Sequence, residues 1–124
     1  MSVEIKTDED VVTSFLSGEI DHHVALPIRE KTDAAIISAH PKRVVLDFSG
    51  VTFMDSSGIG LVMGRYKICE SMGASLEIHG LSRHAYKVMC LAGLQNLAVL
   101  KKKKEAEKSE NRLMNSKCNW RAVP

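Results

Sequence analysis

The chain lacks the features that mark several broad classes of protein. Aromatic residues make up only 5% of its 124 residues, so its core must be built mainly from Val, Ile, Leu, Met and Ala. No apolar run comes near the roughly 20 residues that a membrane-spanning helix needs. The first ten residues are polar and acidic, and they do not resemble a signal peptide. We therefore expect a cytoplasmic protein that has no membrane partner.

Cysteine is also scarce. The three cysteines, Cys69, Cys90 and Cys118, form no CxxC pair, and their number is odd. This pattern favours a reducing compartment over a disulfide framework or a zinc site. None of the five histidines has a cysteine or an HExxH partner at the spacing of metal ligands. We therefore expect neither a metal site nor a cofactor.

Charge is unevenly distributed along the chain. The net charge of +2 combines −3 over residues 1–100 with +5 over residues 101–124. The first part is thus mildly acidic, so the basic overall charge says nothing about a nucleic-acid-binding face on it, and we expect no nucleic-acid partner. We predict one folded domain over residues 1–100 and a basic C-terminal tail over residues 101–124. The tail either continues as a helix to about Leu113 and then becomes disordered, or it is solvated throughout.

The hydrophobic pattern alternates between strand and helix periods. Five short apolar runs are predicted as strands, over residues 3–6, 11–16, 43–48, 74–78 and 97–100. Three longer segments are predicted as helices, over residues 24–39, 57–72 and 81–92. This alternation predicts an α/β fold with a mostly parallel sheet that starts with an antiparallel hairpin. Pro27 fits the first turn of the first helix, which leaves residues 21–23 in the loop before it.

The predicted connectivity gathers three loops at one edge of the sheet. Right-handed crossovers bring the carboxyl ends of parallel strands together, and here those ends lead into residues 18–23, 54–58 and 79–82. Ligand and partner sites of open α/β sheets lie at this edge. We therefore expect the functional site there.

The middle loop carries the most informative residue, Ser56. It lies at or next to the start of a helix, where its hydroxyl can accept hydrogen bonds from backbone N–H groups two or three residues on. The same N–H groups and the positive end of the helix dipole can instead hold an anion, including a phosphate on Ser56 itself. A simple helix cap and an anion site both fit the residues.

Motifs of three other site types are not met. A hydrolase nucleophile elbow needs a glycine two residues before the serine, and Met54 stands there. No P-loop is present, and the run from Gly58 to Gly64 has one spacer too many for a dinucleotide-binding fingerprint. Gly60 and Gly64 are instead predicted to share one helix face and to let that helix pack closely on the sheet.

Two histidines, His22 and His23, accompany Glu19 and Asp21 in the first loop. A general base would need a nucleophile and a pocket that excludes water, and short loops leave little room for one. We expect these histidines to hydrogen-bond the backbone. A phosphate on Ser56 would face nearby carboxylates such as Asp21, and it would change the surface charge without unfolding the helix.

Two longer stretches form a more specific pattern. They read Gly-Glu-Ile-Asp-His-His at 18–23 and Phe-Met-Asp-Ser-Ser-Gly-Ile-Gly at 53–60, and the second continues as Leu-Val-Met-Gly-Arg-Tyr-Lys to residue 67. Together they closely resemble the anti-sigma factor antagonists of the STAS fold, of the sporulation type. The resemblance covers about residues 3–100, and it implies a mixed, mostly parallel sheet packed with helices.

The resemblance implies a bacterial regulatory protein rather than an enzyme. Members of the family bind an anti-sigma factor that is a serine kinase and brings its own ATP and magnesium, and they thereby free a sigma factor for transcription. The kinase phosphorylates the first serine of the Asp-Ser-Ser-Gly loop, here Ser56, and a serine phosphatase reverses this inactivation. The residues expected at the partner surface are Asp21, His22, His23, Asp55, Ser56, Ser57, Gly58 and Ile59.

Other functions compete with this interpretation. The same fold serves as a cytoplasmic regulatory subunit of membrane transport systems, although those relatives tend not to combine Asp-Ser-Ser-Gly with Gly-Arg-Tyr-Lys. A small hydrolase would need a catalytic base near Ser56. The chain departs from the family after Leu100, where an amphipathic helix is usual and a run of four lysines stands here.

Overall fold

The structure of the protein is a computed structural model that describes residues 2–103. Its elements are β1 (Ser2–Asp8), β2 (Val11–Ile20), α1 (His22–Ala39), β3 (Arg43–Met54), α2 (Ser57–Met72), β4 (Ser75–Leu81), α3 (Arg83–Leu91), the 3-10 helix η1 (Leu94–Asn96) and β5 (Val99–Lys102). Strands and α-helices follow one another in the predicted order. The α/β fold class is therefore confirmed.

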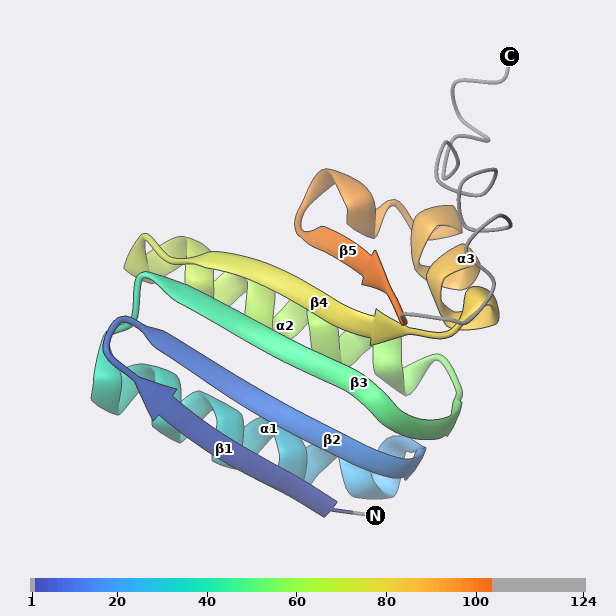
Figure 1. The fold of residues 1–124 in the computed structure, drawn as a ribbon, viewed down its shortest axis with the longest axis horizontal. Coiled ribbons are helices and arrows are strands. Elements are labelled where there is room, and N and C mark those ends of the chain that lie inside the picture. Colours follow the sequence, from blue (N-terminus) through green and yellow to red (C-terminus); the bar gives the residue numbers. More distant parts are fainter. Residues whose placement is uncertain (1, 104–124) are drawn as a thin grey trace.

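The five strands form one mixed sheet in the order β1-β2-β3-β4-β5. β1 and β2 are an antiparallel hairpin, and the other three pairs are parallel. Helices α1 and α2 lie side by side behind the sheet in the view of Figure 1, and α3 lies beyond the end of β4. The carboxyl ends of β2, β3 and β4 point to the same side, which is where the three helices begin.

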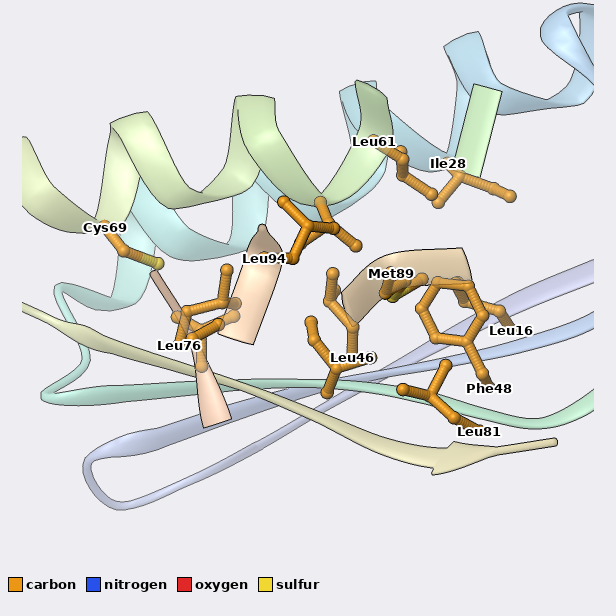
Figure 2. Close-up of a cluster of buried hydrophobic side chains, with 14 of the residues drawn as sticks. Leu16, Ile28, Leu46, Phe48, Leu61, Cys69, Leu76, Leu81, Met89 and Leu94 are labelled. Atoms are coloured by element: carbon orange, nitrogen blue, oxygen red, sulfur yellow. The ribbon is translucent and has the colours of Figure 1, made fainter. Parts of the chain in front are cut away.

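The core fills the layer between the sheet and its helices. Side chains from both meet there, including Leu46 and Phe48 of β3, Leu61 of α2 and Met89 of α3 (Figure 2). Aliphatic residues make up most of the core, as the shortage of aromatic residues predicts. A buried hydrogen bond of 3.0 Å between Ser14 and Thr32 joins β2 to α1 within this layer.

Three strands run further toward the site than predicted. β4 ends at Leu81 instead of residue 78, so residues 79–81, predicted as part of a loop, are strand. β2 continues to Ile20 instead of ending near residue 16, because Glu19 and Ile20 still pair with the distal part of β3 after two register irregularities. β3 continues to Met54 instead of ending near residue 48. Residues 18–20, predicted as part of a loop, are thus strand.

Helix α1 also begins earlier than predicted. Asp21 is its N-cap, and one carboxylate oxygen accepts hydrogen bonds from the backbone N–H groups of His23 and Val24, at 2.9 and 3.1 Å. The two histidines therefore lie in the first helical turn, and their placement in the preceding loop was wrong. Pro27 consequently falls beyond the first turn, where it has no N–H to donate to the carbonyl of His23.

The last elements lie close to their predicted positions. Ser82 caps α3 by accepting a hydrogen bond of 3.0 Å from the N–H of Ala85, so the helix begins at Arg83 rather than residue 81. The last strand is displaced by two residues, to Val99–Lys102. The predicted tail helix to Leu113 and the disorder after it lie outside the described residues. Within residues 2–103, no helix is long and apolar enough to span a membrane.

Candidate functional site

The structure brings the three predicted loops together at the carboxyl edge of the sheet. The N–H of Asp55 donates to the carbonyl of Ile20 at 3.2 Å, which joins the loop after β3 to the end of β2. On the other side, Phe53 and Met54 line a hollow of about 250 Å³ together with Ser82. A hydrogen bond thus joins the first two segments, and the third segment shares a hollow with the second.

Asp21 is fixed as a charged residue on the α1 side of the site. Its hydrogen bond from the Val24 N–H, with a smaller contribution from His23, lowers the pKa of the carboxyl below its usual range. The rings of His22 and His23 contact each other at a centroid distance of 4.2 Å with a tilt of 34°, and neither side chain hydrogen-bonds the backbone within the described part of the chain. The expectation of backbone-bound histidines was therefore wrong, because both side chains project from a helical turn.

Ser56 occupies the N-cap position of α2, but its side chain does not cap the helix. Its backbone is helical, with φ −63° and ψ −12°, and its hydroxyl forms no cap hydrogen bond. The carboxylate of Asp55 accepts the hydrogen bond from the Ser57 N–H instead, at 2.8 Å. Of the two interpretations of Ser56, the helix cap is therefore not what the structure shows. The exposed hydroxyl has no hydrogen-bond partner among residues 2–103.

The next residues of α2 pack beneath the loop, against Met54 and the core. Gly58 is buried, and a Cβ at this position would lie 2.3 Å from the Cγ and Sδ atoms of Met54. Ser57 and Ile59 are half-buried, and Ile59 packs against the core. The predicted partner residues thus divide into an exposed group and a group that positions it. His22, His23, Asp55 and Ser56 are the exposed residues.

The glycines further along α2 do not contact the sheet. Nothing lies within 4 Å of the position that a Cβ would take at Gly60 or Gly64, so the prediction that they allow close packing on the sheet was wrong. The buried face of α2 is instead formed by Gly58, Leu61, Val62, Arg65 and Cys69. A glycine in a helix interior is about 1 kcal/mol less favourable than alanine. The internal packing of the described residues offers no compensation at either position.

A groove runs between α1 and α2 and ends at the site. It holds a hollow of about 400 Å³, and we call it the α1–α2 groove; its lining residues are His22, Ala25, Leu26, Arg29, Ser57, Gly60 and Leu61. His22 and Ser57 belong to the predicted partner surface as well. Leu26 is 44% exposed, although it is a large apolar residue. The sequence interpretation missed Leu26 and Arg29, because both look like ordinary surface positions of an amphipathic helix.

A buried ion pair fixes the spacing of the two helices near this groove. Arg65 of α2 is 3% exposed, and its Nε lies 2.6 Å from Oδ1 of Asp33 in α1, without the alignment of a hydrogen bond. Its other nitrogens donate to Asp33 Oδ2 at 3.2 Å and to the carbonyl of Leu61 at 3.1 Å. Burial raises the pKa of Asp33, and the guanidinium opposes this shift. The sequence analysis missed this ion pair, although an arginine on the apolar face of a predicted helix indicates a buried charge.

Comparisons with known proteins agree with this architecture. The family model of the STAS domain matches residues 2–107. An anti-sigma F factor antagonist of Lysinibacillus sphaericus is 38% identical over 92 residues, which cover 74% of this chain and 78% of that protein.

Two solved structures of a relative are also similar. The anti-sigma factor antagonist SpoIIAA in its unphosphorylated form matches with a TM-score of 0.70 and 28% identity, over 92% of this chain and 97% of that chain. The Bacillus cell fate determinant SpoIIAA in the phosphorylated form matches with a TM-score of 0.66 and 28% identity, over 90% and 99% of the two chains. With its five-stranded mixed sheet and a family match over most of its length, this chain belongs to the STAS domain family.

Proposed function

We propose that the protein is an anti-sigma factor antagonist, a regulatory binding protein rather than an enzyme. The relative from Lysinibacillus sphaericus carries this function in its name, and SpoIIAA has the same fold. The observation that carries the proposal is the Asp55–Ser56 turn at the carboxyl edge of the sheet, where the Ser56 hydroxyl has no hydrogen-bond partner within residues 2–103. The unmodified protein binds the anti-sigma factor and so releases the sigma factor.

Phosphorylation of Ser56 is the proposed switch. The anti-sigma factor is a serine kinase that brings Mg-ATP, and it transfers the γ-phosphoryl group to the Ser56 oxygen as the hydroxyl proton leaves and ADP forms. A phosphoserine carries about −1.5 to −2 charges at neutral pH. It is introduced next to Asp55 in the chain, and Asp55 is joined by a backbone hydrogen bond to Ile20, the neighbour of Asp21. Backbone hydrogen bonds lower the pKa of Asp21 and so keep it ionised.

The added charge acts on the partner rather than on the fold. The first N–H groups of α1 and α2 are held by aspartates, so the phosphate does not replace an existing cap. It changes the charge of a surface that includes the exposed His22 and His23. A loss of about 2–3 kcal/mol in this contact weakens binding by one to two decades. A serine phosphatase restores the binding form by hydrolysis.

The test compares three baits for the host's proteins: the wild type, Ser56→Ala and Ser56→Asp. Ser71→Ala, which changes another exposed serine of α2, is the matched control. We expect the wild type, Ser56→Ala and Ser71→Ala to retain a serine-kinase anti-sigma factor, and Ser56→Asp to lose it. The purified kinase with Mg-ATP should add one phosphate to the wild type and none to Ser56→Ala, as read by mass spectrometry.

Two results would contradict the proposal. Equal binding of the anti-sigma factor by the wild type and Ser56→Asp would remove Ser56 from the switch. Recovery of a transporter ATPase by all baits, without an anti-sigma factor, would instead identify a regulatory subunit of a transport system.

A further inference from the structure

Strand β1 is an outer strand of the sheet, and one of its sides has no neighbour. It is the first strand in the sheet order, so β2 alone pairs with it among residues 2–103 (Figure 1). A two-residue turn at residues 9–10 joins these strands, and the residues that flank such a turn form a hydrogen-bonded pair. Bonded and non-bonded pairs then alternate along the hairpin. The backbone N–H and C=O groups of Val3, Ile5 and Thr7 therefore point away from β2.

The exposed face of β1 carries one charge of each sign. The apolar side chains of β1 pack against the core, so Glu4 and Lys6 lie on the opposite face of the sheet, where both are exposed. Their direct neighbours on β2 are Phe15 and Thr13, which carry no charge. Neither Glu4 nor Lys6 forms an ion pair with any residue that the structure describes. The two charges are therefore available to a molecule that pairs with this edge.

The shape of β1 also favours pairing with another strand. Proteins commonly protect an edge strand by making it short, by a bulge or by a proline. β1 has seven residues, no proline and no register irregularity against β2. By contrast, β5 at the other edge has four residues, and its register against β4 is irregular. β1 is thus the edge that is suited to a further strand.

The charges identify that strand as β1 of a second copy, in one register. When two copies pair antiparallel about a two-fold axis, the residues with outward backbone groups must face each other. A register centred on residue 4 would place Glu4 opposite Glu4, and one centred on residue 6 would place Lys6 opposite Lys6. A register centred on Ile5 instead places each Glu4 opposite Lys6 of the other copy, and it pairs the whole strand.

We propose that the protein forms a two-fold symmetric dimer through β1, in which the two sheets join into one continuous sheet. Each Glu4 lies opposite Lys6 of the other copy in a non-hydrogen-bonded pair, where side chains come closest. Opposite charges at such positions stabilise a strand pair, and like charges destabilise it. Because β2 lies between this contact and the Ser56 turn that follows β3, the dimer does not depend on the proposed function.

Sedimentation velocity of the full chain over a series of concentrations tests the dimer. One strand pair is a small interface, so we expect a reversible dimer with a Kd of about 10–100 μM. Glu4→Lys and Lys6→Glu each turn both charge pairs into like pairs, and each should raise the Kd at least about tenfold. Glu70→Lys is the matched control, because it changes an exposed glutamate of α2 and should leave the Kd unchanged.

Rescue by opposite charge tests the register. In a mixture of Glu4→Lys and Lys6→Glu, one chain has only cations at these positions and the other has only anions. The two variants should therefore associate with each other about as tightly as the wild type does with itself. The double variant Glu4→Lys/Lys6→Glu exchanges the charges and should also dimerise. Thr7→Pro removes an outward N–H group, so it should prevent dimerisation while circular dichroism shows a folded monomer.

Three results would overturn the inference. A wild type that remains monomeric up to about 500 μM would leave this edge to solvent or to a strand of another protein. A dimer whose Kd is the same in Glu4→Lys and Lys6→Glu as in the wild type would place the contact on another surface. Failure of the two variants to associate in the mixture, although each is folded, would refute the register.

Discussion

Replacement of Arg65 by methionine should destabilise the protein because it leaves the partly buried Asp33 carboxylate without its partner. Methionine keeps much of the apolar stem of the arginine but removes the guanidinium, which is 2.6 Å from Asp33 and also donates to the Leu61 carbonyl. Breaking a buried ion pair by removing one partner typically lowers stability by about 3–5 kcal/mol. The Asp33 side chain is 22% exposed and so keeps some hydration. We therefore expect Arg65→Met to lower the free energy of unfolding by about 2–3 kcal/mol at pH 7, at or below the lower end of the usual effect.

The measurement is urea denaturation of the wild type, Arg65→Met, Asp33→Leu and the double variant. The double variant removes both charges, so it should be more stable than Arg65→Met by about 1–2 kcal/mol. Burial raises the pKa of Asp33, and this shift is no longer opposed in Arg65→Met. A carboxyl whose folded pKa lies above its unfolded value penalises folding above that value, so the loss should shrink as the pH falls from 7 to about 4.

The reasoning would be refuted by either of two results. A loss below about 1 kcal/mol for Arg65→Met would mean that the pair is too hydrated to act as a buried ion pair. A double variant no more stable than Arg65→Met would mean that the arginine acts by packing alone.

Two further predictions concern the sheet. The hydrogen bonds from Arg43 lower the pKa of Glu77. The Glu77 carboxylate should therefore stabilise the fold fully above its unfolded pKa near 4.5, and this stabilisation should be lost as the pH falls below that value. Glu77→Gln should make stability less dependent on pH, as measured by denaturation at a series of pH values. Gly80→Ala should lower the stability of the fold by about 1–3 kcal/mol in thermal unfolding. The φ of Gly80 is +72°, and a Cβ there would lie 2.7 Å from the backbone nitrogen of Ser49. Gly73→Ala is the control and should lower stability less, because Gly73 has a similar φ but open space around its Cβ position.

The order of strands and helices could be predicted from the sequence, but the ends of the strands could not. Gly18 and Glu19 look like a loop because one lacks a side chain and the other is charged. They remain in β2 because they pair with β3, which continues alongside them. This pairing depends on a segment more than 30 residues away in the chain, which local sequence patterns do not reveal. The same extension carries the strand to Ile20, which places Asp21 at the start of α1.

The sequence predicted that three segments meet at one edge of the sheet, and they do, but their finer contacts were not predicted. That this edge is the functional site stays a prediction. Ser56 and Asp55 are both good capping residues, and the sequence does not say which side chain reaches the first N–H groups. For Gly60 and Gly64, helical spacing shows that they share a face but not whether that face meets the sheet or the solvent. The burial of Arg65 was not predicted, although an arginine among apolar residues is a signal for it, and its partner Asp33 lies 32 residues away in the chain.

The capping of α2 by Asp55 has a consequence for repeated cycles of the proposed phosphorylation. The Asp55 carboxylate, and not the Ser56 hydroxyl, accepts the hydrogen bond from the Ser57 N–H. Under the proposed phosphorylation of Ser56, we therefore expect the phosphate to be added and removed without loss of this capping hydrogen bond. The start of α2 should then have the same backbone conformation in both forms, and removal of the phosphate should restore the original surface.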